Sequence, residues 1–215
     1  MTTRSRRKPP KSILIGDAGV LVGFILGGQI GILTLVCQGK DFVLQVPNQV
    51  DVEVVRVIKR KDVAVSPTGV VAWKMMKDMG LVVVLKEPTI GSPVAASVAA
   101  YLGVRSGSKP TSEKDLGEYY VISHAVDLQA RGESVAVAID DATARLLARA
   151  KKLEVLTTEQ LLEYAIEFDA FPNGQELVDC YDKIGEVATL RPLTETMLEL
   201  HQQNREKARS GTPEP

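Results

Sequence analysis

The sequence predicts an α/β fold, a three-layer sandwich with a central parallel sheet, followed by a helical C-terminal extension. Short β-rich apolar runs alternate with helical segments along most of the 215 residues. Strands separated by helices of this length form βαβ units, in which helices cover both faces of a parallel sheet. The chain is 45% hydrophobic and 25% charged, a balance that supplies a real core and excludes disorder of the whole chain.

Five short runs are the expected strands. The first contains Ile13-Leu14-Ile15, an unbroken apolar run of the kind found in strands buried on both faces. The second is entered through the turn at Gly39-Lys40 and is stopped by Pro47, because proline cannot donate to a sheet ladder. The expected strand ranges are 12–16, 41–46, 81–85, 134–139 and 153–156.

Apolar spacing and capping residues mark the expected helices. After Pro47, a helix over 48–59 places Val50, Val54 and Ile58 on one face. Ser92-Pro93 joins a capping serine to a proline at the first helical position, and the run that starts at Thr157 opens another helix. Further expected helices cover 67–79 after the cap at 66–67, 93–102, 116–130, 142–151, 175–186 and 194–207.

The chain divides into three parts. Residues 1–11 contain five basic residues and no acid, and they are expected to form a flexible basic arm that serves as a solubilising tail or as a nucleic-acid contact. Residues 12–168 form the α/β domain. Residues 169–215 follow a change of pattern, and they are expected to form a helical extension outside the α/β unit, with a disordered tail over Ser210–Pro215.

Composition excludes several classes of protein. Cys37 and Cys180 are too few for a disulfide scaffold or a cysteine zinc site, and the absence of a CxxC fits a reducing, cytoplasmic setting. The chain has two histidines, His124 and His201, which makes a histidine-based metal centre an unfavoured interpretation. The net charge of −1 excludes a generally basic surface, and without the arm 21 basic residues face 27 acidic ones.

The most apolar stretch, Ala18–Val36, invites comparison with a membrane anchor because it follows a basic segment. Five glycines and Gln29 interrupt it, and Asp17 stands at its edge, where burial in a bilayer is costly. We therefore favour core helices broken near Gly27-Gly28 and no membrane contact. A membrane-anchored protein is the third-ranked alternative.

Acidic residues follow the expected strands at the positions where parallel sheets form their sites. Asp17 follows the first strand, Glu53 lies early in the helix after the second, and Asp140-Asp141 follows the fourth. Glu118 begins the helix that precedes the fourth strand. Carboxylates that converge raise one another's pKa, and Mg²⁺ or Mn²⁺ relieves the repulsion. Each acid taken singly has a structural reading as a helix cap or as part of a solvated helix face.

Four segments in order resemble the motifs of PIN-domain ribonucleases. ILIGDAGVLVGFI is similar to the first motif, with its strand-ending aspartate, and VPNQVDVEVV is similar to the second. The segment LGEYYVISHAVDLQARGESVAVAIDDATARLLA resembles the third and fourth motifs together. The likeness spans residues 12–162 and is closest to the virulence-associated protein C type of toxin from bacterial toxin–antitoxin pairs.

The resemblance implies metal-dependent hydrolysis of RNA phosphodiesters by a cytoplasmic enzyme. It implies that Asp17, Glu53, Glu118 and Asp141 are the catalytic acids that bind Mg²⁺ or Mn²⁺, with Asp140 competing with Asp141. It also implies a cognate antitoxin if the protein is a toxin rather than a housekeeping nuclease.

Three further expectations concern surfaces and departures from the family pattern. Arg145 and Arg149 flank the last acid pair and are expected to contact the RNA backbone, unless they belong to a solvated helix face. The methionine-containing helix Pro67–Met79 and the C-terminal helices are candidate interfaces for a homodimer or an antitoxin. Ala18 and Ile139 stand where the family often has hydroxyl residues, which motivates the alternative of a non-catalytic PIN-like binding or scaffold module.

Overall fold

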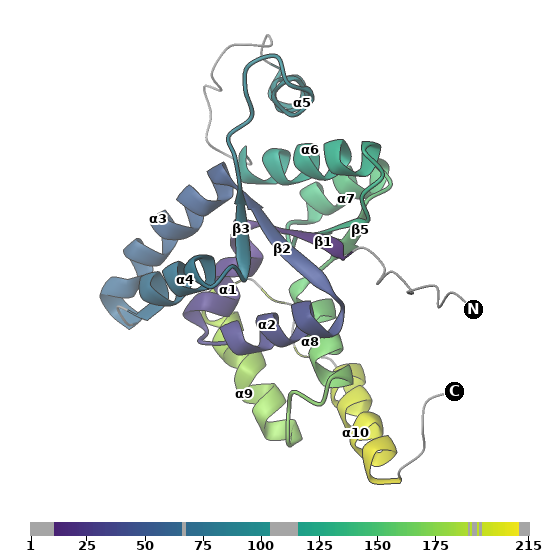
Figure 1. The fold of residues 1–215 in the computed structure, drawn as a ribbon. Coiled ribbons are helices and arrows are strands. Elements are labelled where there is room, and N and C mark those ends of the chain that lie inside the picture. The colour runs from purple at the N-terminus through teal and green to yellow at the C-terminus, as the bar shows by residue number, and fades with distance from the viewer. Residues whose placement is uncertain are drawn as a thin grey trace, which may run out of the picture.

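The structure is a computed structural model that describes residues 11–65, 68–103, 116–188, 190, 193 and 195–210. Figure 1 shows the path of the chain through it. Three expectations fall outside the described residues. They concern the basic arm up to residue 10, the cap at Ser66-Pro67 and the tail beyond residue 210.

The centre of the molecule is one five-stranded sheet in which every neighbouring pair is parallel. The strand order is β3-β2-β1-β4-β5. The first strand lies in the middle, and its Leu14 and Ile15 are completely buried. The strands are β1 (Ser12–Gly16), β2 (Phe42–Pro47), β3 (Val82–Leu85), β4 (Val135–Ala138) and β5 (Glu154–Leu156). The predicted α/β class with a central parallel sheet is confirmed.

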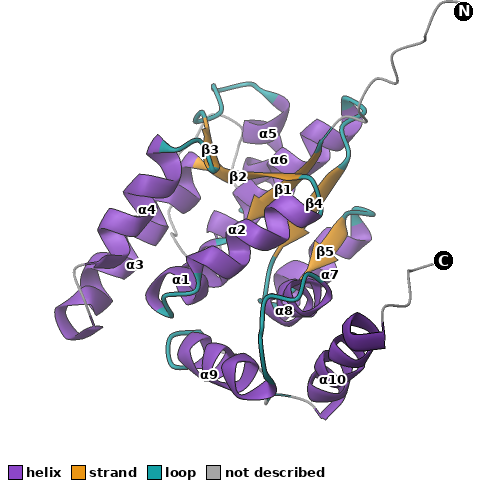
Figure 2. Ribbon diagram, turned by 60° about the horizontal axis from the view of Figure 1, so that its bottom comes forward, coloured by secondary structure: helices purple, strands orange, loops and turns teal. Residues whose placement is uncertain are grey.

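Helices cover the sheet on both faces, as Figures 1 and 2 show from two directions. On one face α6 contacts β1, β2 and β4, with α5 and α7 packed against it, and on the other α2 lies on β2 and contacts α8. At the β3 side, α3 and α4 pack together. The bounds are α1 (Ala18–Leu26), α2 (Ile30–Gly39), α3 (Asn48–Val65), α4 (Thr68–Asp78), α5 (Pro93–Tyr101), α6 (Leu116–Ala130), α7 (Ala142–Ala150) and α8 (Thr158–Glu167).

The apolar run Ala18–Val36 folds as two short helices, α1 and α2, as the glycine pattern predicts. The break falls at residues 27–29, where Gly28 has a φ of +70°, a left-handed conformation that glycine adopts without strain. Within the described residues, no helix combines the length and the apolar character that a bilayer crossing requires.

The C-terminal helices α9 (Gly174–Gly185) and α10 (Glu195–Ser210) differ from the expectation that they lie outside the α/β unit. Helix α9 packs on α1, and α10 packs on α8 and α9. Leu177 and Ile184 are completely buried in the same core cluster as the sheet. The close packing depends on Gly23 of α1, because a Cβ there would stand 3.1 Å from Ile184 Cγ2. The extension therefore completes the sandwich at its α1 side.

Candidate active site at the carboxyl edge of the sheet

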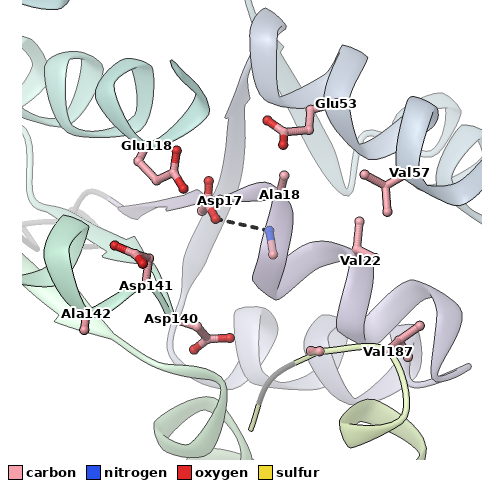
Figure 3. A pocket seen from close by; sticks show the side chains of 12 residues that line it. Asp17, Ala18, Val22, Glu53, Val57, Glu118, Asp140, Asp141, Ala142 and Val187 are labelled. Atoms are coloured by element: carbon pink, nitrogen blue, oxygen red, sulfur yellow. Dashed lines mark hydrogen bonds between the residues drawn. The ribbon is translucent and has the colours of Figure 1, made fainter. Parts of the chain in front are cut away.

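All five acids named from the sequence line one cavity of about 600 Å³ at the carboxyl ends of the central strands (Figure 3). Asp17 directly follows β1, and Asp140 and Asp141 follow β4. Glu53 reaches the cavity from the second turn of α3, and Glu118 reaches it from the first turn of α6. Among the described residues, the other lining residues are Ala18, Gly19, Val22, Val57, Ala142, Val187 and Ala188, none of them basic.

Asp17 is the most deeply placed of these acids, with 6% of its surface exposed. Its Oδ2 accepts a hydrogen bond of 3.1 Å from the backbone N–H of Gly19, so it also caps α1. Burial raises its pKa from 3.8 to about 7, and the charges of Glu118 and Glu53 add to the rise, against the lowering effect of backbone N–H groups. Without a cation, Asp17 therefore holds a proton up to near-neutral pH.

Glu53 and Asp17 approach each other beside Gly117, the second residue of α6. A Cβ on Gly117 would stand 2.9 Å from Glu53 Oε2 and 3.6 Å from Asp17 Oδ1. The absence of a side chain at this position gives the Glu53 carboxylate its room, whereas the distance to Asp17 is an ordinary van der Waals contact. On its outer side Glu53 is 3.9 Å from Arg56, a half-exposed pair one helical turn apart. Gly117 was not named from the sequence, although a glycine in a helical first turn beside a candidate ligand is a readable signal of close approach.

The structure separates the roles of Asp140 and Asp141, which the sequence left open. Both oxygens of Asp140 are bound by Thr158, the first residue of α8: its N–H donates over 2.8 Å and its hydroxyl over 2.7 Å. Asp141 caps α7 through Oδ1, which accepts from Ala144 N–H at 2.8 Å. Asp140 thus ties β4 to α8, and Asp141 uses one oxygen for its cap.

Thr158 is a second residue that the sequence reasoning missed. Its side chain is completely buried, and its hydroxyl donates to Asp140 from α8. In the PIN pattern a hydroxyl residue often stands directly before the last acid pair, at the position of Ile139 here. Ile139, at that position, is completely buried and is not among the lining residues. Burial raises the pKa of Asp140, and the two bonds from Thr158 oppose the rise.

The donor chemistry of the cavity suits a hard divalent cation. Within the described part of the chain, no group of three histidine, cysteine, aspartate or glutamate side chains stands ready-made to hold a metal ion. Mg²⁺ is commonly held through one or two carboxylates while it keeps several of its waters, so a complete protein cage is not required. Burial is the main cause of the raised pKa of Asp17, and the charges of Glu118 and Glu53 add to it; a bound cation would favour the ionised carboxylate against both effects.

Arg145 and Arg149 lie on α7, just beyond the acid pair. Arg145 is half-buried, and its charge acts weakly to lower the pKa of Asp140. Arg149, one turn further along, is exposed. Neither lines the cavity. Arg145 therefore acts on the cavity from outside it, through its charge beside Asp140.

Comparison with known proteins identifies no relative of this chain. The chain matches no protein-family model, and it has no significant match among curated proteins or solved structures.

Proposed function

We propose that this protein is a metal-dependent endoribonuclease that hydrolyses RNA phosphodiester bonds, of the kind found among PIN-domain toxins. The observation that carries the proposal is the buried carboxylate of Asp17. It shares one cavity with four further acids, and burial raises its pKa to about 7, with the charges of Glu118 and Glu53 adding to the rise. A cluster of carboxylates that opposes its own ionisation, at the carboxyl edge of a parallel sheet, is typical of a site built for a cation and an anionic substrate.

Each polar residue of the site has a distinct task in the proposal. Asp17, Glu53, Glu118 and Asp141 would hold Mg²⁺ or Mn²⁺, which when bound supplies charge stabilisation at the phosphate and a more acidic water. Asp140 holds the end of β4 against α8 through Thr158. Arg145 and Arg149 would contact RNA phosphates next to the cavity, which positions the strand without reading its sequence.

Cleavage of a labelled single-stranded RNA by the full chain tests the proposal. We expect cleavage with Mg²⁺ or Mn²⁺, none with a chelator, and a loss of at least a hundredfold in Asp17→Asn. Asp78→Asn, at an exposed aspartate of α4 outside the cavity, is the matched control and should retain the wild-type rate. Equal rates in wild type and Asp17→Asn would count against the proposal.

A non-catalytic PIN-like module is the second candidate, and it is favoured by the absence of a ready-made metal group among the described residues. It has a separate signature in the same experiment. Such a protein binds RNA, with or without metal, and leaves it intact. Binding that survives in Asp17→Asn, together with no cleavage by the wild type, would support this candidate over the nuclease.

The proposal includes a homodimer and, for a toxin, a cognate antitoxin. Helix α4 offers a surface for a second copy of the chain. Its Trp73 and Met76 are buried. Val71 and Met75 of α4 and Met79, the residue after its end, are spaced four positions apart and are 61%, 56% and 64% exposed. Light scattering of the purified chain measures the mass in solution. A dimer that Met75→Lys converts to monomer supports this part of the proposal, and a wild-type monomer contradicts it.

A further inference from the structure

The cavity that holds the acids has a second, apolar end. Val22 of α1, Val57 of α3 and Val187, which follows α9, lie along the right side of Figure 3, with Glu53 near Val57 at the top. Asp17, Glu118 and Asp141 lie on the left. Ala188 completes this apolar wall. A site that acted only on the phosphate group would have little use for such a wall, because the phosphate is charged and strongly hydrated.

Packing of α9 fixes the wall in place. The backbone N–H groups of Val187 and Ala188 both donate to the carbonyl of Ile184, over 3.1 and 2.9 Å. Ile184 is completely buried against α1, and a Cβ on Gly23 would stand 3.2 Å from the Cβ of Ala188. Residues about 165 positions apart are thus held in contact by the core, and Val187 remains only half-buried.

The size and the two-sided chemistry of the cavity define the ligand. About 600 Å³ is within the range of small-molecule sites and exceeds the needs of a phosphate group with its cation. The ligand must carry an anionic group for the acidic, cation-binding end and a flat, weakly polar group for the valines. A nucleotide unit of RNA has both, and its base is free to enter a cavity only when the strand is single and unstacked.

We infer that Val22, Val57 and Val187 form a base subsite that takes the nucleobase next to the scissile phosphate of single-stranded RNA. This inference rests on the proposed nuclease function and extends it. It makes the C-terminal extension, through Val187, part of the substrate site. The subsite binds the base through apolar contact, so the enzyme should prefer RNA that carries a base at this position over RNA that lacks it.

Cleavage of two matched sets of oligoribonucleotides tests the inference. One set is intact, and the other lacks a single base on the 5′ or the 3′ side of the mapped cleavage position. With Mn²⁺ present, we expect the wild type to prefer intact RNA about tenfold or more in kcat/KM at one of the two positions. Val187→Ser should bring that ratio down toward one, because it removes the apolar contact while leaving the acids in place.

Val178→Ser is the matched control, since Val178 is a half-buried valine of α9 that does not line the cavity. It should keep the wild-type ratio. If Val187→Ser does not fold, Val57→Ser provides the same measurement from α3. A wild-type enzyme that cleaves intact and abasic RNA equally well at both positions overturns the base subsite and leaves the nuclease standing. No cleavage of any RNA by the wild type overturns both.

Discussion

Gly117 of α6 and Glu53 of α3 lie so close that any side chain on the glycine would push the Glu53 carboxylate from its present position. A Cβ at position 117 would stand 2.9 Å from Glu53 Oε2. The contact joins two helices that approach the sheet edge from different directions, and it sets the position of a carboxylate in the cavity.

The substitution Gly117→Ala is therefore expected to displace Glu53 and leave the fold intact. Alanine stabilises a helix relative to glycine by about 1 kcal/mol, and the carboxylate can swing away at the end of a flexible side chain. We expect cleavage to fall about tenfold and the melting temperature to stay equal or rise. Gly31→Ala in α2, where nothing lies within 4 Å of the added Cβ, is the control that should leave cleavage unchanged. Unaltered cleavage in Gly117→Ala would contradict this role for the glycine.

Asp17 is expected to destabilise the metal-free protein at neutral pH. Its pKa is about 7 in the folded protein and about 3.8 in the unfolded chain, so between these values the folded state holds a proton that the unfolded state has lost. Folding stability from this group therefore falls as the pH rises from about 4 to about 7. The full difference corresponds to about 4 kcal/mol.

Denaturant unfolding of wild type and Asp17→Asn at several pH values measures this effect. In a chelator, Asp17→Asn should be more stable than wild type by about 2–4 kcal/mol at pH 8, and the gap should close near pH 4. Addition of Mn²⁺ should narrow the gap at pH 8, because the ion binds the ionised carboxylate of the wild type. A gap that is the same at both pH values would refute the assignment.

Substitution of Asp140 should mainly lower stability, whereas substitution of Asp141 should mainly lower cleavage. Asp140→Ala leaves the buried N–H and hydroxyl of Thr158 without their acceptor, and we expect the free energy of unfolding to drop by about 1–3 kcal/mol. Asp141→Asn retains a good helix cap and should change stability by less than about 0.5 kcal/mol, while cleavage falls at least tenfold. The opposite pattern in calorimetry and cleavage assays would exchange the two roles.

Arg149 should contribute to RNA affinity and not to the chemistry. Arg149→Ala is expected to weaken binding of single-stranded RNA at low salt and to reduce the slope of log affinity against log salt by about one unit. Lys74→Ala, an exposed lysine on α4 that also lies outside the cavity, is the control of equal charge change. Identical salt slopes for the two variants would show that α7 presents an ordinary solvated face.

Features that depend on neighbours in the chain could be predicted from the sequence. Ser92 caps α5, and Thr157 with Gln160 forms the capping box of α8, because these bonds close over three residues. The unbroken apolar runs are also local features, and they predict strands buried on both faces of a parallel sheet. Because sites in such sheets form at the carboxyl ends of the strands, Asp17 and the acid pair could be placed at one edge. The order of the elements and the gathering of the five acids were thus accessible before any coordinates.

Features that depend on how helices turn and pack were decided only by the tertiary structure. The bond of Asp140 to Thr158 spans 18 positions, and the contact of Gly117 with Glu53 spans 64. Val187 reaches the cavity only because α9 settles on a glycine surface of α1. A sequence pattern states which face of a helix is apolar, but the rotation and crossing of two helices follow from the shapes of all side chains between them. The identity of the acids in the site could therefore be predicted from the local sequence. The distances between them, the contacts of Asp140 with Thr158 and of Glu53 with Gly117, and the apolar wall opposite them depend on tertiary packing.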